Sequence, residues 1–129
     1  MMNITNFIVS SVLLVCIDSV YLSLIKDFFK AQIVDVQKSP FQINMVGAIL
    51  SYLFLIIGIN YFIIQSHKSV FDAFILGLII YGVYEGTTYA LLKNWRINTV
   101  VIDTLWGGIL FALVTYLTYY LSSLKIFSK

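Results

Sequence analysis

The sequence predicts an all-α integral membrane protein in which four transmembrane helices form an up-down bundle. Hydrophobic residues make up 60% of the 129 residues and charged residues only 11%. Mean hydropathy is +0.95, which lies outside the range of soluble domains. Four apolar stretches of about 20 residues, the length that crosses a bilayer, account for most of the chain. We therefore expect a single membrane domain over residues 1–129, with lipid as its solvent.

The first span is predicted at about residues 5–25. It should end where a polar connector begins, because charged side chains are not tolerated in hydrocarbon. The charged residues of this connector are Lys26, Asp27, Lys30, Asp35 and Lys38. Pro40 suits the first turn of a helix, and Ser39 before it can act as the cap. The second span is therefore predicted at about residues 41–64.

The third and fourth spans are predicted at about residues 70–92 and 99–121. The polar tract 65–69 predicts a tight turn before the third span, and residues 93–98 connect it to the fourth. Helices joined by short turns pack alternately up and down. Basic residues flank both sides, with Lys26, Lys30, Lys38, Lys93 and Arg96 on one and Lys68, Lys125 and Lys129 on the other. This bias favours an orientation in which both termini lie outside the cytoplasm.

Three acidic residues, Asp18, Glu85 and Asp103, lie inside or at the edge of the apolar spans. Placing such a side chain in lipid costs at least about 2.5 kcal/mol, so each needs a partner. Asp18 and Glu85 lie roughly 10 Å inside the ends of their predicted helices, at about 1.5 Å per residue. Asp103 enters from the same side of the membrane. We therefore expect all three acids in one leaflet.

Helical spacing places aromatic and polar side chains beside these acids. Tyr81, Tyr84, Glu85 and Thr88 follow the i, i+3, i+4, i+7 pattern of one helix face, and small residues such as Gly77 and Gly107 allow helices to approach closely. The candidate binding pocket consists of Asp18, Tyr21, Tyr81, Tyr84, Glu85, Thr88, Asp103 and Trp106. The other aromatic residues, Tyr52 and Trp95 among them, are assigned to interfacial belts without a chemical role.

Two interpretations of the acids stay open. The pocket could bind a cation, a proton or a polar lipid group, as intramembrane ionisable groups often do. Alternatively, the acids could accept hydrogen bonds from Tyr, Thr, Ser and Trp, or pair with Lys26, Lys93 and Arg96, and so fix the bundle of a structural protein, for example in a viral envelope. Small residues on the helix faces also suggest a homo-oligomer.

Other functions find less support in the sequence. A lipid-modifying enzyme could use the acids for general acid–base chemistry, but no nucleophile or cofactor motif is present, which favours a protein that is not an enzyme. A carboxylate-only metal site would suit hard cations, whereas zinc or redox metals need the His or Cys ligands that these positions lack. The cofactor is unknown. The basic residues are scattered, which argues against nucleic-acid binding.

Three motifs resemble a membrane-protein family known as domain of unknown function 2177, found in bacteria and some large DNA viruses. The tract at residues 81–90, YGVYEGTTYA, is similar to the family's Y-G-x-Y-D-x-T-N-x-A and is followed by Trp95. Glu85 replaces the usual Asp and Thr88 the usual Asn. The family's D-x-x-W-G and D-x-x-[WY]-L resemble the tracts that begin at Asp103 and Asp18. The resemblance covers nearly the whole chain and implies architecture and site candidates, but no activity. A composition rich in Ile, Phe, Tyr, Asn and Lys, typical of AT-rich genomes, agrees with a viral or host internal membrane.

Overall fold

Four long helices make up most of the chain. The computed structural model describes residues 3–39 and 42–124, and no strand occurs in this part. The elements are α1 (Ile4–Gln37), α2 (Met45–Ile59), the π-helical turn η1 (Asn60–Ile64) that continues α2, α3 (Val70–Leu91) and α4 (Ile97–Ser122). With α2 and η1 taken together, each of the four is long and apolar enough to cross a membrane. The predicted all-α, four-helix membrane protein is confirmed.

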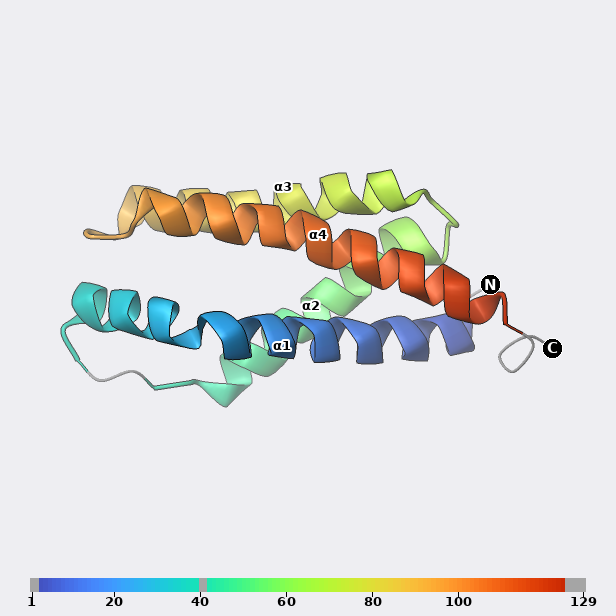
Figure 1. Ribbon diagram of the computed structural model, residues 1–129, viewed down its shortest axis with the longest axis horizontal. Coiled ribbons are helices and arrows are strands. Elements are labelled where there is room, and N and C mark those ends of the chain that lie inside the picture. The colour runs from blue at the N-terminus through green and yellow to red at the C-terminus, as the bar shows by residue number, and fades with distance from the viewer. Residues whose placement is uncertain (1–2, 40–41, 125–129) are drawn as a thin grey trace.

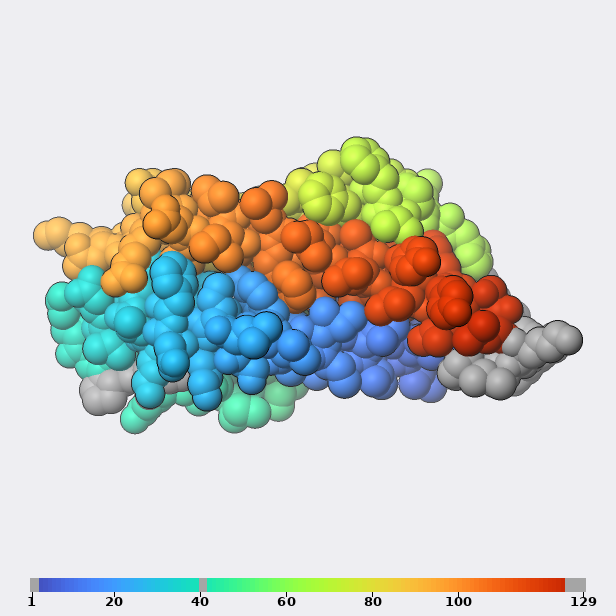
Figure 2. All heavy atoms as spheres, viewed as in Figure 1, coloured from blue at the N-terminus to red at the C-terminus, as the bar shows by residue number. Residues whose placement is uncertain are grey.

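The helices are arranged as a tight pair with two further helices against it (Figure 1). α3 and α4 run antiparallel and pack along most of their length, α1 lies beside α4, and α2 crosses obliquely. α1 and α3 end where α4 begins, which we call the connector end. The start of α1, the end of α4 and the turn between η1 and α3 lie together at the opposite end, which we call the terminal end. Figure 2 shows α1 and α4 side by side along one face of the molecule.

The predicted bounds of the last two helices are correct to within two residues, whereas the predicted end of the first is wrong. α1 continues to Gln37, and the charged side chains of Lys26, Asp27 and Lys30 are exposed along this extension. A helix satisfies its own backbone groups in water as well as in lipid. Charged residues therefore mark the end of the membrane span without ending the helix.

The predicted start of the second helix is also wrong. Residues 42–44 are not helical, and α2 begins at Met45. Asn44 is its cap, because its side chain accepts a hydrogen bond from the backbone N–H of Gly47 at 3.2 Å. Pro40 and Phe41, around which the predicted start was placed, lie outside the described residues. The predicted end at residue 64 matches the end of η1.

Glycine residues allow α3 and α4 to approach closely near their middle. A Cβ atom at Gly77 would overlap the backbone carbonyl of Gly107, and one at Gly107 would overlap the ring of Tyr81. From this crossing toward the terminal end, apolar side chains form the core. Its buried members are Leu14, Ile59, Ile63, Ile64, Ala73, Leu110, Phe111 and Val114.

A buried amide attaches η1 to α1 near the terminal end. Asn60 donates hydrogen bonds to Ser10 Oγ and to the carbonyl of Ile56, both at 3.0 Å. Gln65 donates to Asn60 Oδ1 at 3.2 Å, and its own Oε1 accepts from the backbone N–H of Asn3. Because water does not reach groups inside the bilayer, such bonds fix the position of one helix against another.

Gln32 attaches the extension of α1 to α4 at the connector end. Its side chain is fully buried, and its Oε1 accepts hydrogen bonds from the backbone N–H of Arg96 at 2.7 Å and from the hydroxyl of Thr99 at 3.0 Å. Arg96 is the N-cap of α4 and makes no side-chain capping bond. Gln32 therefore supplies, from another helix, an acceptor at the start of α4.

Replacing Gln32 by Ala is expected to destabilise this junction by about 1–2 kcal/mol, because it leaves two donors without an acceptor. Hydrogen exchange measured by mass spectrometry should become faster over residues 96–100. Lys30→Ala, an exposed change on the same extension, is the matched control and should leave the exchange of these residues unaltered. Equal protection of the start of α4 in both variants would show that Gln32 does not hold it.

Candidate functional site

The three intramembrane acids come from three different helices and gather on the connector side of the glycine crossing. Glu85 on α3 is fully buried, Asp18 on α1 is 6% exposed and Asp103 on α4 is 8% exposed. The carboxyl group of Asp103 lies within electrostatic range of those of Glu85 and Asp18. We call these three residues the carboxyl cluster.

Asp18 connects α1 to two other helices. Its Oδ1 accepts a hydrogen bond from Trp106 Nε1 on α4 at 2.9 Å, and its Oδ2 accepts one from the hydroxyl of Tyr52 on α2 at 2.7 Å. Both oxygens of this buried carboxyl group therefore have a neutral donor.

Asp103 and Glu85 have one aromatic donor each. Tyr21 on α1 donates to Asp103 Oδ1 at 3.2 Å, and Trp95, in the connector between α3 and α4, donates to Glu85 Oε1 at 2.9 Å. The second oxygen of Glu85, Oε2, is buried and has no hydrogen-bond partner among the described residues. A buried acceptor without a donor is costly, so this oxygen is the least satisfied atom of the three carboxyl groups.

No basic side chain in the described residues pairs with the cluster. In that part of the chain the single ion pair joins Lys38 and Asp35 at the surface, at 3.3 Å. Lys26, Lys93 and Arg96, which the sequence offered as alternative partners, are exposed. Nor does any group of three His, Cys, Asp or Glu residues within the described ranges have an arrangement that could hold a metal ion. The carboxyl groups are therefore held by neutral donors alone.

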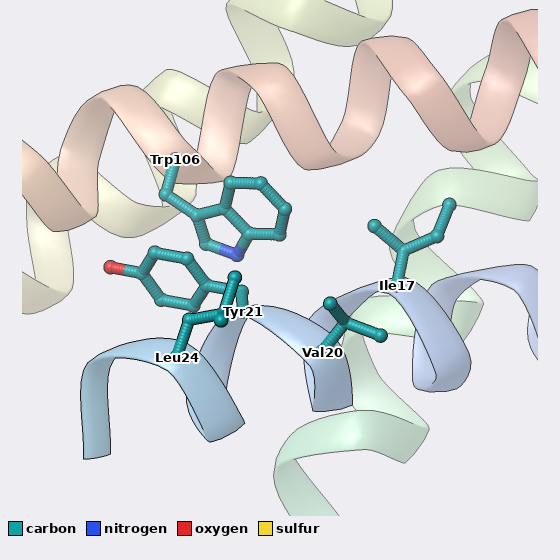
Figure 3. A pocket seen from close by; sticks show the side chains of 5 residues that line it. All are labelled: Ile17, Val20, Tyr21, Leu24 and Trp106. Atoms are coloured by element: carbon teal, nitrogen blue, oxygen red, sulfur yellow. The ribbon is translucent and has the colours of Figure 1, made fainter.

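Two stacked aromatic rings lie beside two of the three acids, Asp18 and Asp103. The rings of Tyr21 and Trp106 are nearly parallel, with an interplanar angle of 4° and centroids 4.3 Å apart. With Ile17, Val20 and Leu24 they line an open, apolar groove of about 300 Å³ between α1 and α4 (Figure 3). The Tyr21 hydroxyl and the Trp106 N–H are bound to Asp103 and Asp18. The same two side chains thus contact the groove and the acids.

The other predicted pocket residues lie around the cluster in different ways. Tyr81 interacts electrostatically with Asp18 and Asp103. Tyr84 interacts with Glu85 and Asp103, although its side chain is largely exposed. Thr88 instead donates its hydroxyl to the carbonyl of Tyr84, one turn earlier in its own helix, at 2.7 Å. The hydroxyl of Thr88 thus bonds to the backbone of its own helix. Among the described residues, no hydrogen bond joins Thr88 to a carboxyl group.

Two donors to the cluster, Tyr52 and Trp95, were not predicted, because both residues were assigned to interfacial belts. A signal for Trp95 was present, because this residue follows the motif tract that contains Glu85. No comparable signal exists for Tyr52, since hydropathy does not define the rotation of a helix that is apolar on every side.

Four apolar helices around a buried carboxyl cluster define a multi-pass α-helical membrane protein. The family described as "Predicted membrane protein (DUF2177)" matches residues 3–120. The chain belongs to this family, which confirms the resemblance drawn from the three motifs. No curated protein and no solved structure matches the chain.

Proposed function

We propose that this membrane protein binds protons inside the bilayer, at the carboxyl cluster of Asp18, Glu85 and Asp103, in a binding or transport-like role. The observation that supports the proposal is the absence of a counter-charge. All three acids are buried, their hydrogen-bond donors are tyrosine and tryptophan side chains, and the described residues offer them no Lys or Arg.

Energetics favour protons held within this cluster. Each ionised carboxyl group in a low-dielectric interior costs several kcal/mol unless a cation compensates it, and two ionised groups in contact also repel each other. A proton placed between Glu85 and Asp103, whose carboxyl groups lie within electrostatic range of each other, removes one charge. It also gives Glu85 Oε2, which lacks a donor, a hydrogen bond.

A proton fits the geometry better than a metal ion or a polar lipid group. Hard cations take six or more oxygen ligands, whereas both oxygens of Asp18 are already bound by Trp106 and Tyr52. The neighbouring groove is apolar, and the stacked rings of Tyr21 and Trp106 line it. A proton needs no cavity and can pass along hydroxyl groups and carboxyl oxygens.

A structural role is the second candidate, and the bonds of Asp18 favour it. This one residue of α1 binds donors on α2 and α4, so it could serve mainly to set the packing of three helices. In that case removal of an acid would alter stability by the same amount across neutral and alkaline pH, where the carboxyl group is ionised in both the folded and the unfolded state.

Infrared spectroscopy and thermal melting together test the proton-binding proposal. At neutral pH, we expect the purified protein in lipid nanodiscs to show the C=O stretch of a protonated, buried carboxyl group. Glu85→Gln and Asp103→Asn should each weaken or shift that band. Asp27→Asn, which changes an exposed acid of α1, is the matched control and should leave the band as it is.

The proposal also predicts whether the melting temperature rises or falls with pH. Raising the pH removes the shared proton and leaves adjacent, uncompensated charges, so the melting temperature of the native protein should fall as pH rises. Glu85→Gln cannot form that charge pair and should melt at a temperature that depends less on pH. Absence of a protonated carboxyl band, together with a pH-independent loss of stability in the variants, would contradict proton binding and support the structural role.

A further inference from the structure

Arg96 is an exposed cation without an acidic partner in the described part of the chain. It is the N-cap of α4 at the connector end, and its guanidinium lies over the ring of Phe28 on α1, 6.0 Å from the centroid. The ion pair found among the described residues involves Lys38 and Asp35 instead. Arg96 is therefore available to bind an anion beside the junction of α1 and α4.

The apolar groove runs along α1 toward this arginine. Ile17, Tyr21 and Leu24 line the groove, and Phe28, four residues further on, continues the same helix face. From Ile17 to Phe28 the helix rises by roughly 16 Å at about 1.5 Å per residue. This length is close to the half-thickness of the hydrocarbon core, which is about 15 Å. The groove together with the Phe28–Arg96 contact beyond it thus spans about the thickness of one lipid leaflet.

Basic residues are in excess at the connector end, beyond the groove. The α1 extension and the two connectors at this end carry Lys26, Lys30, Lys38, Lys93 and Arg96 against the acids Asp27 and Asp35, five positive charges against two negative ones. Juxtamembrane basic residues attract anionic lipids, and a guanidinium binds phosphate oxygens in a bidentate manner. Charge and shape are therefore complementary to a lipid with an anionic headgroup.

We propose that the groove lined by Ile17, Val20, Tyr21, Leu24 and Trp106 binds one acyl chain of an anionic phospholipid whose phosphate is held by Arg96. The lipid lies on the outside of the α1–α4 junction, and none of the three acids of the carboxyl cluster lines its groove. The proposal thus goes beyond proton binding, and its test has a separate readout.

Tryptophan fluorescence offers that readout, because Trp106 lines the groove and the chain has only two tryptophans. In a Trp95→Phe background, whose protonated-carboxyl band is recorded separately because Trp95 donates to Glu85, phosphatidylglycerol with brominated acyl chains should quench Trp106 at a lower mole fraction than brominated phosphatidylcholine does. We expect a preference of about fivefold, the effect of one basic residue near the membrane surface. Arg96→Gln should abolish the preference. Lys38→Gln, which removes a cation that is already paired with Asp35, should retain it.

A second pair of variants tests the acyl-chain part of the site. Val20→Phe places a ring in the groove and should reduce quenching by both brominated lipids. Val12→Phe, at an equally exposed position of α1 that does not line the groove, should not reduce it. Equal quenching of Trp106 by the two lipids in the parent protein, or a preference that survives Arg96→Gln, would overturn the proposal. Quenching unaffected by Val20→Phe would exclude the groove as the place of the acyl chain.

Discussion

Adding one methyl group at Gly77 is expected to lower the free energy of unfolding by about 3 kcal/mol, at the upper end of the cost of overpacking. The new Cβ would collide with the backbone carbonyl of Gly107. A backbone carbonyl cannot rotate away as the end of a flexible side chain can, so α3 and α4 would have to separate. Because these helices form the most extensive contact of the fold, the loss should extend beyond the site of the substitution.

Gly86→Ala is the matched control for Gly77→Ala. Both glycines lie on α3, but a Cβ at Gly86 meets no atom within 4 Å. Since Ala is the better helix former, this variant should be at least as stable as the native protein. Reversible unfolding in mixed detergent micelles measures both changes. A Gly77→Ala protein that unfolds at the same detergent fraction as Gly86→Ala would show that the close crossing is not required.

Asp18→Leu is expected to cost about 2–6 kcal/mol, because it removes the acceptor of two buried donors. The hydroxyl of Tyr52 and the N–H of Trp106 both bind this carboxyl group, and each donor left unsatisfied costs about 1–3 kcal/mol where water cannot replace the partner. Asp18→Asn keeps one acceptor oxygen, so its loss should be about half as large.

The same unfolding assay measures the effect of Asp18→Leu. Asp27→Leu, an exposed change one turn beyond the groove on the same helix, should alter stability by less than about 0.5 kcal/mol. If Asp18→Leu were as stable as the native protein, the donors would have found other acceptors and Asp18 would not connect the three helices.

Hydropathy predicted the number of helices and the bounds of α3 and α4 because apolar length alone determines a membrane span. It failed for α1, where Lys26 and Asp27 were taken as the end of the helix although α1 continues to Gln37. A scale that measures transfer into lipid carries no information about a helix beyond the lipid. The start of α2 was missed because Asn44 and the Ser39–Pro40 pair are both plausible caps, and local sequence does not rank them.

The proximity of the three acids could be predicted from the sequence, whereas their partners could not. Counting residues from the helix ends placed Asp18, Glu85 and Asp103 in one leaflet, and the structure gathers their side chains. The donors Tyr52 and Trp95 depend on how each helix is rotated about its axis. That rotation is set by contacts such as the Gly77–Gly107 crossing, which involve residues distant in sequence.

The unequal lengths of the helices have a mechanical consequence. At about 1.5 Å per residue, the 34 residues of α1 measure roughly 50 Å, whereas the hydrocarbon core is about 30 Å thick. Because Gln32 binds the start of α4, the surplus length of α1 is attached to α4, and we expect these two segments to move together where they leave the bilayer. We expect α1 and α4 to tilt together when the bilayer becomes thinner or thicker. The stacked contact between Tyr21 and Trp106 lies between the two helices and would be the point about which they tilt.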